Sequence, residues 1–177
     1  NFRYLSSKWR KNTEEEALLG VSITGIYDCP YLLESEPKQL EELKNHAIKI
    51  NERWAKNIGI NPATAITCVK PSGTVSQLTD SANGHYIRRV RNDKKDPLSQ
   101  TLIDQGVQYI TDPYNDSAYV FEFPRKSPKS AITRKEINPI YQLGLWKKFA
   151  ISWCEHKPSM TCYVNEKEWP EVGSWVW

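Results

Sequence analysis

The sequence predicts an α/β fold, and three features of its 177 residues support that prediction. Helical and extended segments alternate along the chain, as in folds whose parallel strands are covered by helices. Segment 37–58 carries apolar residues at three- and four-residue steps, which is typical of an amphipathic helix. The run from Ala63 to Val69 is short, apolar and rich in β-branched residues, which indicates a strand buried on both faces.

The first segments predicted are a short helix and a short strand. Thr13 and Glu16 have the spacing of a capping box, and Gly20 can end the turn that they open. Residues 20–26 then read as a short buried strand. Gly25 inside this strand suggests a bend or a close approach of the backbone.

The long helix 37–58 is the clearest element of the sequence. Pro37 suits its first turn, and Gly59 is expected to stop it. Its opposite face is Lys, Glu and Asn, as on an ordinary solvated face. One apolar stripe is expected to face the core, made of Leu40, Leu43, Ala47, Ile50, Trp54 and Ile58.

Four further elements are expected in the second half. Residues 86–91 suggest a half-exposed extended segment, and residues 97–106 a short helix with Leu98, Leu102 and Ile103 inward. Residues 118–123 predict a strand that Pro124 ends. Residues 159–164, in which apolar and polar side chains alternate, predict a last strand.

A second capping box, Thr133 with Glu136, is expected to open another helix. There is neither an internal repeat nor a linker, so 1–177 is predicted to be one segment without an internal domain boundary. The helix that Thr133 and Glu136 open is expected to have a broad apolar face, made of Ile140, Leu143, Trp146, Phe149, Ile151 and Trp153.

Composition narrows the possible functions. The 24 basic and 21 acidic residues give a net charge of only +3, which argues against a nucleic-acid or membrane surface. No apolar run approaches the length that spans a membrane. The four cysteines form no CxxC pair, so free thiols in a reducing cytosol are expected. Because the chain lacks an initiator Met, we expect it to be part of a longer protein.

The most informative stretch is 61–78, a buried strand followed by a Gly-containing turn and a helix start rich in hydroxyl groups. Free backbone N–H groups and the positive end of a helix would converge there on an anion, usually phosphate. Gly73 would let the backbone come close, and Lys70 could add charge. In the alternative interpretation Ser72 and Thr74 only cap a helix, and the chemistry alone does not choose between the two. The Walker and GxGxxG spacings are absent.

Lys-Pro-Ser-Gly-Thr-Val-Ser-Gln-Leu at 70–78, with Asp-Ser-Ala-Asn-Gly at 80–84, closely resembles the phosphate-binding loop of class II ribonucleotide reductases, which depend on adenosylcobalamin. Segments 20–26, 86–93 and 153–161 also resemble parts of that family, in family order. The resemblance implies that the chain supplies much of the second half of the family's ten-stranded α/β barrel. It further implies that the substrate's phosphates are held by Ser72, Gly73, Thr74, Val75 and Ser76.

The resemblance also implies the reaction and its participants. A ribonucleotide would be reduced to a deoxyribonucleotide by a thiyl-radical mechanism that adenosylcobalamin initiates. The expected partners are the ribonucleotide, the remainder of the reductase barrel and a thioredoxin-like reductant in the cytoplasm. The family's radical cysteine lies in an Asn-x-Cys-x-Glu context, which surrounds none of the four cysteines here. We therefore assign no catalytic residue to this chain and expect the radical cysteine upstream.

Several alternatives remain beside this interpretation. The family has a further loop after Gly84, whereas His85 follows at once here, so that loop is either lost or missing from the numbered chain. The chain could be a nucleotide-phosphate-binding fragment or split-gene subunit without activity alone, or, less plausibly, a basic nucleic-acid-binding domain. The spacing of Cys154, His156 and Cys162 fits no usual zinc site, so no metal is expected. A basic cluster is expected to form a solvated edge, with contact to nucleotide phosphate or to the cobalamin side chains as the alternative; it is made of Arg88, Arg89, Arg91, Lys94 and Lys95.

Overall fold

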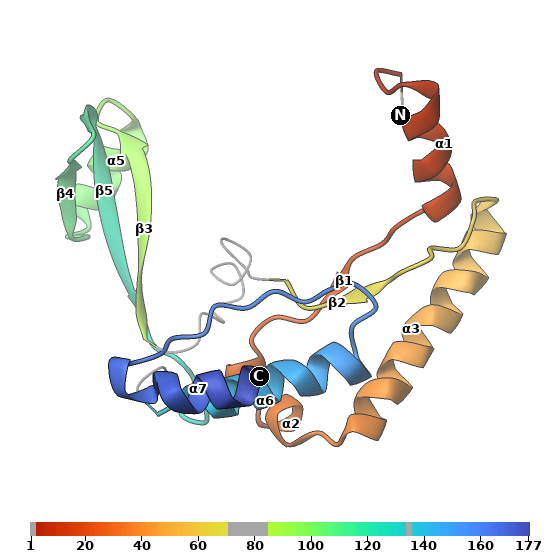
Figure 1. The fold of residues 1–177 in the computed structure, drawn as a ribbon. Helices are drawn as coiled ribbons and strands as arrows, with labels where there is room; N and C mark the ends of the chain where they lie inside the picture. The colour runs from red at the N-terminus through yellow and green to blue at the C-terminus, as the bar shows by residue number, and fades with distance from the viewer. Residues whose placement is uncertain (1–2, 71–84, 134–135) are drawn as a thin grey trace.

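The structure is a computed structural model that describes residues 3–70, 85–133 and 136–177 (Figure 1). Helices and strands are mixed along the chain. The α-helices are α1 (Ser7–Glu16), α2 (Pro30–Glu34), α3 (Pro37–Ile58), α5 (Pro97–Asp104), α6 (Pro139–Ser152) and α7 (Trp169–Val176), and the 3-10 helices are η1 (Ile26–Asp28) and η2 (Glu166–Glu168). The strands are β1 (Val21–Ser22), β2 (Thr67–Cys68), β3 (Tyr86–Asp93), β4 (Tyr109–Asp112) and β5 (Asn115–Arg125).

Two sheets lie in the described part of the chain. β1 and β2 form a parallel pair in which Val21 lies opposite Thr67. β3, β5 and β4 form an antiparallel sheet in that order, with Val90 and Tyr109 both opposite Phe121. Parallel neighbours are therefore confirmed for β1 and β2 and wrong for the larger sheet. In Figure 1 the antiparallel sheet projects with α5 to one side of the helices.

The main core lies where α3 and α6 meet. Leu40 of α3 is fully buried, and it clusters with Leu145, Phe149 and Trp153 at 9%, 2% and 5% exposure. These residues are packed against the ends of the parallel strands and the turn that follows β1, through Ile23, Ile26, Tyr27, Leu32, Leu33, Val69 and Cys154. The carboxyl end of β2 is thus anchored to the helical core through Val69.

The long helix is confirmed in position and in both ends. α3 begins at Pro37, behind a capping box in which the Glu36 N–H donates to Gln39 Oε1 at 2.8 Å. It ends at Ile58 because Gly59 takes the left-handed conformation with φ +73°. The apolar stripe, however, is only partly covered, since Leu43, Ile50, Trp54 and Ile58 are 41%, 39%, 55% and 63% exposed.

Three predicted boundaries are wrong. The first helix begins six residues before Thr13, because Ser6 caps it, and it ends at Glu16 rather than at Gly20. The Thr13 hydroxyl instead donates to the Trp9 carbonyl within the helix. Pro124 does not end its strand: it lies inside β5, opposite Ile87.

The strand expected at 159–164 is absent from the described structure, where these residues are irregular. The strand expected at 20–26 is reduced to Val21–Ser22, and the one at 63–69 to Thr67–Cys68. Alternation of apolar and polar residues allows an extended chain, but only a partner strand completes the ladder of hydrogen bonds. The pattern therefore located extended segments without fixing their pairing.

Only the Glu136 half of the second capping box forms, and it does not begin a helix. The N–H and the hydroxyl of Thr133 donate to Glu136 Oε2 at 2.8 and 2.6 Å, and these bonds lower the pKa of Glu136. α6 starts three residues later at Pro139, where the Asn138 side chain accepts from the Tyr141 N–H. Asn138 is the better cap because Pro139 can follow it at the first helical position.

Candidate functional site

The candidate site is the carboxyl end of β2, from which the chain enters the predicted phosphate loop. β2 is buried here: Ile66 and Thr67 are 2% and 0% exposed. On one edge β1 pairs with it, since Val21 N–H donates to Ile66 O and Ile23 N–H to Cys68 O. The Lys70 N–H donates to Ser22 Oγ at 3.3 Å. The backbone is thus held by protein contacts as far as Lys70.

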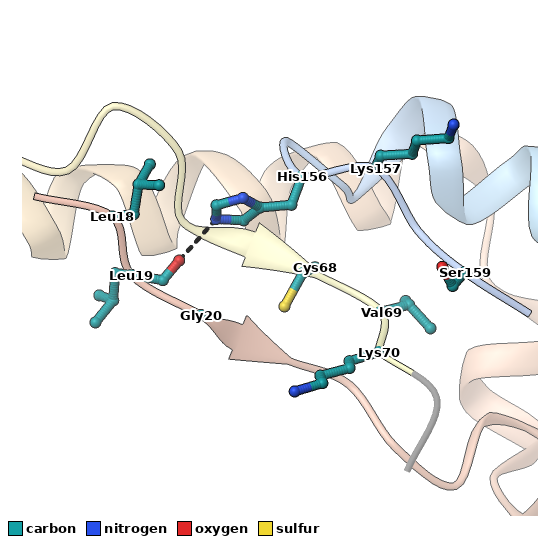
Figure 2. A pocket seen from close by; sticks show the side chains of 9 residues that line it. All are labelled: Leu18, Leu19, Gly20, Cys68, Val69, Lys70, His156, Lys157 and Ser159. Carbon is teal, nitrogen blue, oxygen red and sulfur yellow. Dashed lines mark hydrogen bonds between the residues drawn. The ribbon is translucent and has the colours of Figure 1, made fainter. Parts of the chain in front are cut away.

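An open pocket of about 380 Å³ lies beside this end of the strand (Figure 2). Its walls combine apolar side chains with Lys70, His156, Lys157 and Ser159. In Figure 2 the ammonium groups of Lys70 and Lys157 point away from each other. The apolar part comes from both strands and includes Leu18, Leu19, Cys68 and Val69. The pocket offers positive charge beside an apolar surface, but its two lysines do not converge on one point.

The other edge of β2 is covered by Trp153, Cys154, Glu155 and His156, the four residues after α6, which we term the clasp. Thr67 O accepts from the N–H groups of Glu155 and His156 at 2.9 and 3.1 Å. Glu155 Oε2 accepts from the N–H groups of Ile66 and Thr67 at 3.0 and 3.2 Å. The clasp therefore acts in place of a neighbouring strand.

Two side chains extend the clasp to both strands. Trp153 Nε1–H donates to Cys68 O at 2.9 Å, and the Thr67 hydroxyl donates to Trp153 O. His156 Nε2 lies 2.8 Å from Leu19 O, just before β1 (Figure 2). Because a carbonyl oxygen can only accept, the hydrogen of this bond must be on Nε2. Residues from α6 onward thus hold the parallel pair together.

Comparison with known proteins gives this geometry its context. No protein-family model matches the sequence. The adenosylcobalamin-dependent ribonucleoside-triphosphate reductase of Levilactobacillus brevis is 30% identical over 202 residues, which cover 93% of this chain and 27% of that enzyme. The enzyme of the same name from Lactobacillus delbrueckii subsp. bulgaricus is 33% identical over 97 residues, which cover 51% of this chain and 13% of that enzyme. A probable enzyme of this name from Dictyostelium discoideum is 28% identical over 169 residues, which cover 87% of this chain and 22% of that protein.

A solved structure agrees with these relatives. A B12-dependent (class II) ribonucleotide reductase matches 93% of this chain and 28% of its own, with a TM-score of 0.77 and 22% sequence identity. In sequence and in fold, the chain is similar to part of the B12-dependent ribonucleotide reductases. Its α/β fold is that of part of the class II enzyme, which confirms the predicted fold class. The chain spans between 13% and 27% of the length of the relatives named above.

The residues predicted to bind phosphate lie outside the described part of the chain. Ser72, Gly73, Thr74, Val75 and Ser76 all fall in 71–84, so their role stays a prediction. The loop expected after Gly84 also stays a prediction. The alignment with the L. brevis enzyme spans 202 residues, more than the 177 of this chain, so that enzyme contains positions without a counterpart here.

Three residues of the basic cluster make contacts within their own sheet. Arg89 Nε lies 2.8 Å from Glu122 Oε1, and Arg91 pairs with the buried carboxylate of Asp112. The Lys94 ammonium lies 4.9 Å from the centre of the Tyr119 ring. The side chains of Arg89 and Arg91 are 64% and 63% exposed, which agrees with the solvated edge that the sequence predicted.

Cys154 in the clasp and Cys162 after it are free, partly buried thiols. Burial raises the pKa of the Cys154 thiol, and proximity to Cys68 adds to this, while a Val69 backbone bond and Lys44 oppose it. Burial also raises the pKa of Cys162, with a contribution from Glu168. A raised pKa keeps both thiols protonated and weakly nucleophilic near neutral pH. In the described ranges no three His, Cys, Asp or Glu side chains gather as a metal ion would require.

The clasp is what the sequence analysis missed. Segment 153–161 was noted for its family resemblance, Trp153 for a helix face, and Cys154 and His156 for a zinc spacing that does not fit, whereas Glu155 had no recognised role. Its partners, Ile66 and Thr67, lie 89 and 88 residues away in the sequence. Nothing in local spacing links such distant positions. The one available signal was the polar Glu-His pair that follows the apolar face of α6.

Proposed function

We propose that this chain is the phosphate-binding segment of an adenosylcobalamin-dependent ribonucleoside-triphosphate reductase. The observation that carries the proposal is the alignment with the L. brevis enzyme across 93% of the chain, matched by the same coverage in the fold comparison. Both bacterial relatives are ribonucleoside-triphosphate reductases by name, which favours triphosphate over diphosphate substrates. The reductase would act in the cytoplasm; among the described helices, none is both long and apolar enough to cross a membrane.

Within this function the chain's own residues would bind and orient the substrate. Ser72 to Ser76 would offer backbone N–H and hydroxyl groups to the phosphates at the end of β2. Lys70, on the rim of the pocket, would add positive charge. The pocket is open on one side, so a second part of the reductase would be needed to exclude water.

The radical chemistry would be supplied from outside the chain. Adenosylcobalamin, when bound, provides the radical that a cysteine of the full enzyme passes to the ribose, and a thioredoxin-like protein restores the reducing cysteines. The pocket of about 380 Å³ has the size for a drug-sized group, and adenosylcobalamin is much larger. We therefore assign no described residue to the cofactor and derive no step through it.

The test uses the natural polypeptide that contains this chain. We expect adenosylcobalamin-dependent reduction of CTP to dCTP with thioredoxin as reductant, and no turnover by residues 1–177 alone. Gly73→Val should raise the KM for CTP by about tenfold or more, because a side chain blocks close approach of the phosphate. Ser130→Ala, in an exposed loop, is the matched control.

Two results would contradict this proposal. Turnover by the 177-residue chain alone would show that the radical cysteine is not elsewhere. If the full polypeptide bound no ribonucleotide, the proposed function itself would be wrong. The second candidate, a split-gene subunit, is favoured if the natural protein has the mass of this chain and gains activity only when a second polypeptide is added.

A further inference from the structure

β2 has two edges, and different parts of the chain hold them. β1 covers one edge through bonds to Ile66 O and Cys68 O. The clasp covers the other edge by contacting both the N–H and the C=O of Thr67. Three consecutive residues, 66–68, are therefore fixed in position, two of them almost completely buried. The next residues in the chain, 69 and 70, lead directly to the proposed phosphate loop.

Glu155 is the charged centre of the clasp. One of its carboxylate oxygens accepts from two successive backbone N–H groups, and the Thr67 hydroxyl lies 3.3 Å away. Bonds to an ionised acceptor are stronger than those between neutral groups. The side chain of Glu155 itself is largely exposed. It therefore contributes little apolar packing, and its main effect is on the position of β2.

We propose that Glu155, together with Thr67, is a positioning residue for substrate binding: the clasp sets the place and direction of β2, and thereby the start of the phosphate-binding loop. The inference rests on the proposed function. Binding groups need a supporting layer that fixes their geometry. Here that layer arrives from a segment more than 80 residues later in the chain.

A positioning role and a purely structural role predict different measurements. If the clasp served stability alone, weakening it would lower the melting temperature and leave the KM of the folded enzyme unchanged. If it positions the loop, the KM for the ribonucleotide rises while kcat changes little, because the radical chemistry lies elsewhere. The affinity for adenosylcobalamin should then stay the same.

The experiment compares Thr67→Val, Thr67→Ser and Glu155→Ala in the full natural polypeptide. Thr67→Val and Glu155→Ala should each raise the KM for CTP by about five- to tenfold, with kcat within about twofold of the wild type. Thr67→Ser keeps the hydroxyl and should restore the wild-type KM. Glu41→Gln is the matched control, because Glu41 is exposed on α3 and makes neither an ion pair nor a side-chain hydrogen bond with any described residue.

The possible outcomes separate the two proposals. A wild-type enzyme that reduces CTP, with variants that melt earlier but keep their KM, would overturn the positioning role and leave the proposed function intact. A wild-type enzyme that binds no ribonucleotide would overturn both. Should Glu155→Ala fail to fold, Glu155→Met keeps a long side chain but has no oxygen to accept from the two N–H groups: a raised KM then supports the proposal, and an unchanged KM contradicts it.

Discussion

Lys148 shows how one side chain can complete a helix that lies more than a hundred residues away. Its ammonium group donates to the carbonyl oxygens of Leu33, Ser35 and Leu32 at 2.9, 3.0 and 3.3 Å, at the end of the five-residue helix α2. A cation there also suits the negative end of the helix dipole. Burial lowers the pKa of Lys148, and nearby Glu36 partly offsets this.

Replacing Lys148 with Met should destabilise the protein by about 1–2 kcal/mol, because three carbonyl groups lose a charged donor. Lys147→Met is the control: its ammonium group lies 6.0 Å from the Trp175 ring centre, and its loss should change stability by less than about 0.5 kcal/mol. Urea unfolding of both variants measures the difference. Equal midpoints would show that the three bonds contribute nothing.

For single residues, the sequence predicted only those conformations and contacts that depend on residues nearby in the chain. Gly59 was expected to stop a helix and does so, because a left-handed residue is required at that one position. The contact between Thr133 and Glu136 was also expected and forms. Lys148 and Glu155 were not recognised, since their partners are backbone groups brought near by the fold.

Two glycines differ in the backbone conformation that their helices require: one ends α3 and the other lies within α6. Gly59 ends α3 with φ +73°, where a side chain is strained. Gly144 lies within α6, and a Cβ added there would meet no atom within 4 Å. Replacing glycine with alanine should therefore lower the stability of the protein at Gly59 and raise it at Gly144.

Gly59→Ala should destabilise the protein by about 1 kcal/mol, because alanine must adopt the left-handed conformation. Gly144→Ala should stabilise it by about 0.5–1 kcal/mol, because alanine has the higher helix propensity. Thermal unfolding followed by circular dichroism at 222 nm measures both. A gain from Gly59→Ala would contradict the observed helix end.

Periodicity located best the elements whose own apolar residues recur at helical or strand spacing. α3, α5 and β5 lie where the apolar spacing put them, although Leu98 of α5 is 54% exposed. The segment 159–164 has an equally regular pattern but no partner strand in the described structure. Pairing depends on which other segments are present, and no local pattern contains that information.

For the whole molecule, the main feature is apolar surface that this chain leaves uncovered. Trp54 and Ile58 on α3 are 55% and 63% exposed, and Leu18 and Leu19 beside β1 are 56% and 46% exposed. Such surface is expected where further protein packs. It is consistent with a chain that spans at most 27% of the relatives named above.

The isolated chain should therefore associate with itself and bind a hydrophobic dye. Trp54→Lys with Ile58→Lys should reduce both effects, since two charges would interrupt the exposed stripe of α3. Sedimentation velocity and dye fluorescence would measure them. The control pair, Glu41→Lys with Glu52→Lys, adds charge on α3 without removing apolar surface. If the control pair reduced association equally, net charge and not the stripe would be responsible.

The clasp also has a consequence for biosynthesis. A ribosome completes α3 and both short strands long before it reaches Glu155, which lies 88 residues after Thr67. During that interval β2 has no support on its second edge, and contacts between such distant residues form slowly. Nascent chains of this protein should therefore expose one unpaired edge of β2 until Glu155 has been synthesised, and this makes them substrates for chaperones that shield incomplete sheets.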